Sequence, residues 1–306
     1  MQNSAADYYS LDKYLKAKFG TKVYKLSLNG GMTCPNRDGT LDTRGCIFCS
    51  AGGSGDFAAP FCHDVNKQIE NAKIYVSKKY GADKFIAYFQ AFTNTYAPVE
   101  YLKSIFYPAL LRDDIVALSI ATRPDCLPPD VITLLSELNK IKPVWIELGL
   151  QTIHPDSAEY IRRGYPLETY DEAIKNLRGT VDQIITHVIL GLPNETRDDM
   201  LETVRYVASS GSTGIKLQLL HVIENTDLAR DYRDGKFKTL EMDEYIDLLC
   251  DCVKLLPRDM VIHRLTGDGP KKSLVAPLWS ASKHTVMNTL IKTMVSRDVH
   301  QGSMTD

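Results

Sequence analysis

The sequence predicts an α/β fold in which a parallel β-sheet curls into a partial or complete (β/α)6 barrel of the TIM type, with helices on its outer side. Short runs rich in β-branched and aromatic residues alternate with longer segments of helical periodicity, six times in succession. Such alternation requires parallel strands joined by right-handed crossover helices. Polar residues also follow the runs at equivalent positions, as at the ligand-binding end of a parallel barrel.

Each expected element follows from the local sequence. The helix at 128–140 illustrates the basis, since Pro128 and Pro129 mark its start and Leu134 and Leu138 recur at helical spacing. Strands are expected at 22–29, 84–90, 114–122, 143–151, 183–192 and 214–222. Helices are expected at 64–80, 98–111, 128–140, 155–178, 196–210 and 226–235.

The pattern changes after Gly235. A C-terminal α/β extension at 236–306 is therefore expected to pack on a core barrel at 1–235. Within this extension we expect a helix near 241–256, a strand at 260–265, a turn at "TGDGP" and a helix near 281–297.

Charge is unevenly distributed along the chain. The segment from Lys254 to Arg297, which we call the basic segment, contains eight Lys and Arg residues and two acidic ones, so its net charge is +6. The net charge of the whole chain is −2, so the remainder of the chain carries −8. A surface of this kind binds polyanions such as nucleic acid, and a solvated basic face is the alternative interpretation.

The composition is that of a soluble globular protein, with 44% apolar and 24% charged residues. No apolar run approaches the length of a membrane span, and the first twenty residues lack the apolar centre of a signal peptide. We therefore expect a cytoplasmic protein without membrane contact. Seven cysteines in such a chain indicate reduced thiols or metal ligands rather than disulfides.

Three of these cysteines lie in the segment "CPNRDGTLDTRGCIFC" (34–49), the Cys loop, with C-x11-C-x2-C spacing after the first expected strand. With Cys62 as a fourth ligand, the set would suit a structural zinc ion. Three thiolates on a [4Fe–4S] cluster would instead leave one iron open to a small molecule. The position of the loop at the mouth of the barrel favours the cluster. Phe48 is placed to cover an aromatic ligand or to form a local apolar plug.

Polar residues follow the other expected strands as well. Each of these groups alone could serve as a turn or helix cap, but together they indicate a ligand site at the strand ends. Glu147 lies inside an apolar strand, so it either points into a polar cavity or pairs with a buried cation. The polar groups are Gln90, Thr122 with Arg123, Gln151 with His154, "GLPNET" (191–196), and His221 with Asn225.

A three-cysteine loop after the first strand of a six-unit partial barrel, with an aromatic residue before the third cysteine, resembles the radical S-adenosylmethionine (SAM) superfamily. The commonest spacing there is C-x3-C-x2-C, and the longer first interval of this chain is found in the branch related to the catalytic subunit of Elongator. The chain is most similar to the YhcC/YtqA-like family, through segments such as "YFQAFTNTYAP", "SIATRPDCLP", "WIELGLQTIH" and "HRLTGDGPKKSLVAPLWS".

This resemblance implies that Cys34, Cys46 and Cys49 bind a [4Fe–4S] cluster whose open iron chelates S-adenosyl-L-methionine. Gln90 would hold the methionine amino group, Arg123 and Gln151 would contact the ribose or carboxylate, and the backbone of "LGLP" (190–193) would lie beside the adenine. The full set of expected cofactor-binding residues is Phe48, Gln90, Thr122, Arg123, Gln151, Leu190, Gly191 and Leu192.

The resemblance further implies a 5′-deoxyadenosyl radical formed by reductive cleavage, with an electron donor such as flavodoxin or ferredoxin. The expected substrate is a tRNA, modified at a wobble uridine and contacted by Arg264, Lys271 and Lys272 of the basic segment. The alternatives are radical chemistry on a small metabolite and a zinc-stabilised binding protein without catalysis. The residues identify no substrate-side acid or base, although His154, His187 and His221 are available.

Overall fold

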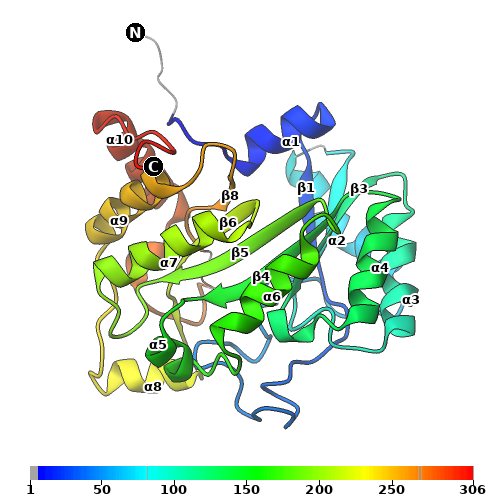
Figure 1. Ribbon diagram of the computed structural model, residues 1–306, viewed down its shortest axis with the longest axis horizontal. Helices are drawn as coiled ribbons and strands as arrows, with labels where there is room; N and C mark the ends of the chain where they lie inside the picture. Colours follow the sequence, from blue (N-terminus) through cyan, green and yellow to red (C-terminus); the bar gives the residue numbers. More distant parts are fainter. Residues whose placement is uncertain (1–5, 81, 268, 270, 306) are drawn as a thin grey trace.

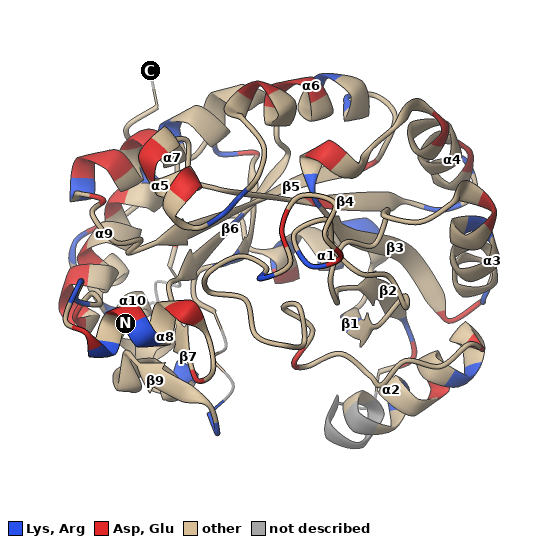
Figure 2. Ribbon diagram, turned by 90° about the horizontal axis from the view of Figure 1, so that it is seen from below, with Lys and Arg blue, Asp and Glu red and all other residues tan. Residues whose placement is uncertain are grey.

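The computed structural model describes residues 6–80, 82–267, 269 and 271–305. Within them the main sheet has seven strands, all parallel, in the order β1-β2-β3-β4-β5-β6-β8. The sheet is curved, with helices on its outer side (Figures 1 and 2), so the predicted α/β partial barrel is confirmed. The strands are β1 (Tyr24–Leu28), β2 (Phe85–Phe89), β3 (Ile115–Thr122), β4 (Val144–Gln151), β5 (Gln183–Leu190), β6 (Gly214–Leu219) and β8 (Val261–Arg264).

Helices α2 to α9 lie in the connections between successive strands of the main sheet, and most of them cover its convex face (Figure 2). No helix among the described residues is long and apolar enough to cross a membrane. The helices are α1 (Leu11–Phe19), α2 (Val65–Tyr80), α3 (Val99–Leu110), α4 (Pro129–Asn139), α5 (Pro155–Tyr160), α6 (Leu167–Leu177), α7 (Arg197–Ser210), α8 (Asp227–Arg233), α9 (Met242–Leu255) and α10 (Lys283–Ser296).

Two expectations require correction. The single helix expected at 155–178 is two helices, because Arg162 and Gly164 adopt left-handed φ angles of 57° and 81° and Pro166 precedes α6. The expected six strands are joined by a seventh, since β8 of the extension pairs with β6 in the same sheet. The division at residue 235 falls between α8 and α9 and stays a prediction.

Some elements were not expected from the sequence. These are α1 and the antiparallel pair of β7 (Val222–Ile223) and β9 (Leu274–Ala276). The turn expected at "TGDGP" contains Asp268 and Pro270, which lie outside the described residues.

Inward-facing side chains form layers, because alternate residues of a strand point to the same face. The first layer is apolar and lies under α1, which covers the N-terminal end of the strands (Figure 1). The side chain of Asp182 fixes α1 by accepting hydrogen bonds from Lys18 Nζ at 2.5 Å and Trp145 Nε1 at 2.9 Å. The buried residues of this layer are Leu15, Val23, Ile86, Ala117, Trp145 and Ile185.

The second layer lies two residues further along each strand and is polar. We call it the middle layer: Lys25, Tyr88, Ser119, Glu147, His187 and Lys216. At its centre the fully buried carboxylate of Glu147 binds Lys25 Nζ at 2.5 Å and Ser119 Oγ at 2.8 Å through one oxygen. The other oxygen binds His187 Nε2 at 2.9 Å and Lys216 Nζ.

These contacts keep Glu147 ionised inside the protein. Burial alone would raise the pKa of Glu147, but Lys216, Lys25 and His187 hold it well below its usual range. Because the carboxylate is charged, His187 Nε2 is the donor in its hydrogen bond. The sequence left two alternatives for Glu147, and both describe it: the carboxylate pairs with the buried Lys216, and the residue also lines a polar cavity.

Glu147→Gln should lower the free energy of unfolding by about 3–5 kcal/mol, because it leaves the buried ammonium group of Lys216 and the partly buried one of Lys25 without their counter-charge. Urea unfolding followed by circular dichroism measures the change. The matched control is Glu159→Gln, which removes an exposed carboxylate on α5 and should change stability by less than about 0.5 kcal/mol. Equal stability of the two variants would show that Glu147 carries no charge in the folded protein.

Candidate active site

A cavity of about 980 Å³ opens at the C-terminal ends of the strands, which is the end at which parallel barrels bind ligands. Its walls come from the Cys loop, from the loops after β2, β3 and β4, and from the C-terminal extension. Its floor consists of the four middle-layer residues that line it, Tyr88, Glu147, His187 and Lys216.

All three cysteines of the Cys loop line this cavity. The loop is held by its own polar contacts: Asn36 Nδ2 lies 3.4 Å from Cys46 Sγ and 2.6 Å from the carbonyl oxygen of Arg162. Arg37 donates to the carbonyl oxygens of Cys49 and Ser50, at 3.2 and 2.6 Å. These contacts position the thiols without using any of them in a disulfide.

The three thiols are close enough to influence one another. Burial and the neighbouring Cys49 raise the pKa of Cys46 to about 12, against the opposing effects of Arg123 and Asn36, and Cys34 raises it further. A buried thiol such as that of Cys46, whose raised pKa disfavours ionisation, becomes a stable thiolate when a metal centre supplies positive charge. Cys62 is not among the residues that line the cavity.

The side chain of Arg123 forms part of the cavity wall and is rigidly held. It makes a bidentate ion pair with Asp125, at 2.9 and 2.7 Å, and lies 5.1 Å from the ring centroid of Tyr165. Burial opposes the charge of Arg123, yet Asp125 raises its pKa above the ordinary value. The adjacent Thr122 hydroxyl is 2.5 Å from that of Thr95, which fixes the start of this loop.

Gln151, at the end of β4, shows two features typical of a ligand contact. Its φ angle of 71° lies in the left-handed region, after a register shift in the pairing of β4 with β5. Its buried side-chain oxygen, which belongs to a cavity-lining residue, has no hydrogen-bond partner among the described residues. Unsatisfied buried oxygens and strained backbone persist mainly where function requires them.

The other expected cofactor residues are only partly brought together. Gln90 lines the cavity and donates to the carbonyl oxygen of Ser54 at 2.9 Å. Phe48 also lines it and packs on an apolar cluster that contains Leu192. Leu190, Gly191 and Leu192 are buried but do not line the cavity, whereas Ile189 does. Contact between 190–192 and a ligand stays a prediction.

The basic residues singled out in the sequence belong to the same cavity. Arg264 is the last residue of β8, where it pairs with Lys216 of β6, and Lys271 and Lys272 are exposed at the rim. The structure therefore joins the Cys loop and the basic segment, which are more than 200 residues apart in the sequence, in one lining.

Sequence reasoning missed Arg163 and Lys216 as cavity residues. Arg163 is 4% exposed, and its guanidinium donates to carbonyl oxygens, including that of Thr152 at 2.6 Å. Arg163 lies in the segment "RRGYP" (162–166), whose Gly and Pro indicate a loop after the fourth strand, but the expected helix at 155–178 included this segment. The signal for Lys216 was a lysine in the apolar run "GIKLQLLHV", which is as unusual for a buried strand as Glu147.

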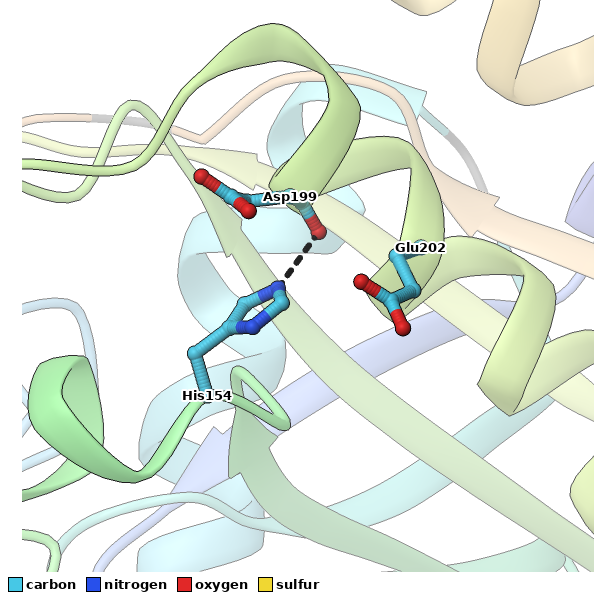
Figure 3. A group of neighbouring side chains, drawn as sticks. All are labelled: His154, Asp199 and Glu202. Carbon is cyan, nitrogen blue, oxygen red and sulfur yellow. Dashed lines mark hydrogen bonds between the residues drawn. The ribbon is translucent and has the colours of Figure 1, made fainter.

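A separate group of potential metal ligands consists of His154, Asp199 and Glu202, whose ligand atoms lie within 4.8 Å of one another (Figure 3). His154 Nε2 is 2.9 Å from the backbone oxygen of Asp199. The Asp199 carboxylate accepts from the backbone N–H and hydroxyl of Thr196, both at 2.7 Å, in a capping box at the start of α7. These contacts give His154 and Asp199 structural roles.

Two family models match the sequence. The model of the radical SAM superfamily matches residues 43–207, and the radical SAM C-terminal domain matches residues 212–296. Among curated proteins, YtqA of Bacillus subtilis is 45% identical over 300 residues, which cover 98% of this chain and 93% of YtqA. YhcC of Escherichia coli K12 is 34% identical over 290 residues, which cover 94% and 92%.

Among solved structures, that of Methanocaldococcus infernus Elp3 with an N-terminal deletion has a TM-score of 0.68 at 19% identity, over 91% of this chain and 64% of that one. The tRNA uridine(34) acetyltransferase of Methanocaldococcus jannaschii is 26% identical over 163 residues, which are 52% of this chain and 30% of that protein. The two likenesses thus span less than two thirds of those longer chains. With matches over most of its length, the chain belongs to the radical SAM superfamily and, within it, to the family of YtqA and YhcC.

Proposed function

We propose that this protein is a radical SAM enzyme that modifies tRNA, with a wobble uridine as its target. One observation carries the proposal: the three cysteines of the Cys loop and the basic residues Lys271 and Lys272 line a single cavity. A cofactor held by the cysteines would therefore face a nucleic acid held at the rim.

In this proposal Cys34, Cys46 and Cys49 hold a [4Fe–4S] cluster. The donor set fits, because thiolates are the usual ligands of such clusters and three of them leave one iron for S-adenosyl-L-methionine. When bound, the cluster and S-adenosyl-L-methionine would together supply a radical that removes a hydrogen atom from the substrate, with electrons from a donor such as flavodoxin or ferredoxin. The cavity residues would orient both reactants and exclude water.

The polar wall of the cavity would bind the S-adenosyl-L-methionine. Gln151 offers a buried amide oxygen that a ribose hydroxyl or an amino group could satisfy. Arg123, held by Asp125 beside the Cys loop, offers positive charge to a carboxylate. Gln90, Thr122 and Phe48 line the same space or its edge and complete the proposed set.

The RNA part of the proposal rests on charge and on relatives. Lys271 and Lys272 are exposed at the cavity mouth, where phosphates of a bound RNA would pass, and Arg264 lies further in. The Elp3 structure and the tRNA uridine(34) acetyltransferase add support, since both resemble part of this chain. The second candidate is radical chemistry on a small metabolite, which a cavity of about 980 Å³ could hold.

Cys34→Ala, Cys46→Ala and Cys49→Ala should each abolish the cluster and S-adenosyl-L-methionine cleavage, because three ligands leave none to spare. Cys62→Ala is the matched control and should keep both. Iron content and the broad absorbance of anaerobically purified protein measure the outcome. Loss of metal in Cys62→Ala equal to that in the other three would favour a four-thiolate site and contradict the radical mechanism.

Gln151→Ala and Arg123→Ala should retain the cluster but weaken S-adenosyl-L-methionine binding by about one to two orders of magnitude. The physical reason is the loss of a buried polar contact worth roughly 1.5–3 kcal/mol. Calorimetric titration of the cluster-loaded protein measures the affinity. Gln183→Ala, at the opposite end of the barrel on β5, is the control and should bind normally. Wild-type affinity in both test variants would exclude the proposed cofactor wall.

The Lys271→Glu, Lys272→Glu double variant should bind tRNA more weakly, whatever the sequence of the tRNA. The slope of the logarithm of the binding constant against the logarithm of salt concentration should fall in magnitude by roughly one unit or less for each lost phosphate contact. Cluster content and S-adenosyl-L-methionine cleavage without RNA should be unchanged. A Lys140→Glu, Lys175→Glu variant makes the same charge change at two exposed positions on the outer surface. If the two double variants bind tRNA equally, the small-metabolite function takes precedence.

A further inference from the structure

The floor of the cavity carries an excess of positive charge. Lys25, whose side chain is 17% exposed, and the more deeply buried Lys216 both bind the single carboxylate of Glu147, so one of the two positive charges is not balanced when both lysines are protonated. The ring of His187 donates to the same carboxylate and adds no negative charge. Buried charge of one sign is costly unless a counter-ion balances it.

The excess charge is directed towards the cavity through Lys216. Its side chain is 8% exposed and lines the cavity, whereas Lys25 does not line it and lies against the rings of Tyr88 and Trp145. An ammonium group has three N–H donors. Among the described residues, Glu147 and the Tyr88 hydroxyl, at 3.2 Å, accept from Lys216.

We propose that the floor of the cavity is a binding site for an oxyanion, a carboxylate or a phosphate group, carried by the molecule that enters the cavity, with Lys216 as its principal ligand. The third N–H of Lys216 would donate to this anion, and the anion would balance the second ammonium of the middle layer. The inference deepens the proposed function, because it states which chemical group of the substrate reaches the bottom of the barrel.

The surroundings of Lys216 support the assignment. Burial lowers the pKa of Lys216 to about 7, and Lys25 and Arg264 add to this effect against the attraction of Glu147. Three further neighbours, His187, His263 and Tyr88, stay neutral near pH 7. Burial lowers the pKa of His187 to about 4, lowers that of His263 well below its usual range, and raises that of Tyr88. Lys216 is therefore the group whose charge changes near neutral pH.

A bound anion should favour the protonated form of Lys216 and raise its pKa. The sign follows from linkage, since an anion that binds the ammonium more tightly than the amine stabilises the ammonium. Anion affinity should accordingly be highest below about pH 7 and fall as Lys216 loses its proton. A difference of one pKa unit corresponds to a tenfold difference in affinity between the two forms.

The experiment uses the cluster-loaded protein with ¹³C-labelled lysine Cε atoms, and NMR follows their chemical shifts as the pH is varied. The pH titration is carried out with no added anion, with acetate, and with sulfate, a phosphate analogue that does not itself titrate in this range. Lys216→Arg identifies the resonance. We expect its midpoint to rise by about one unit with at least one anion. A response to acetate alone indicates a substrate carboxylate, and a response to sulfate alone indicates a phosphate.

A second measurement covers the case in which the resonance is not resolved. An anion that binds the wild-type protein at about pH 6 should no longer bind to Lys216→Gln, which leaves Glu147 paired with Lys25 and Ser119. The same anion should still bind to Lys140→Gln, which changes an exposed lysine outside the cavity. Absence of any midpoint shift, or equal binding by wild type and Lys216→Gln, overturns the inference. Neither readout uses RNA, so a failure of tRNA binding would leave the floor site standing.

Discussion

The Glu147 carboxylate is the interaction on which the shape of the barrel interior depends. Its partners come from β1 and β3 on one side of β4, and from β5 and β6 on the other. One side chain of β4 therefore links strands on both sides of β4 within the sheet. In a flat sheet the side chains of β1 and β6 would be too far apart to meet at one carboxylate. The curvature and this buried ionic network therefore require each other, although β1 and β8 remain at opposite edges.

The layers explain how one fold provides both stability and a reactive space. The apolar layer below α1 is filled by large side chains such as Trp145, while the middle layer satisfies its charges internally except on the side of Lys216. Above it several inward positions are small, including Ser27, Ala121 and Gly149, and these leave room for the cavity. Packing thus decreases and polarity increases from one end of the barrel to the other.

The sequence was sufficient to predict the order of the main elements and the position of the Cys loop, because both depend on local periodicity and spacing. It could not show that Lys25 and Lys216 share Glu147, since the stagger between neighbouring strands determines which inward residues meet. The break between α5 and α6 was readable from Gly164 and Pro166, but helical periodicity on both sides concealed it. The position of α1 depends on tertiary contacts with Trp145 and Asp182 that no local pattern reveals.

Within the part of the chain that the structure describes, α1 closes the N-terminal end of the barrel, and the cavity opens at the other end. Leu15 and the apolar layer fill the end at which the strands begin, so reactants and products share the opening beside the Cys loop. The depth of each binding position would then set the order of binding and release. A molecule bound near the floor would enter before one bound at the rim and would leave after it. A large molecule bound at the rim would block the opening. Its dissociation would then limit the rate at which a cleaved cofactor molecule could leave and a new one bind.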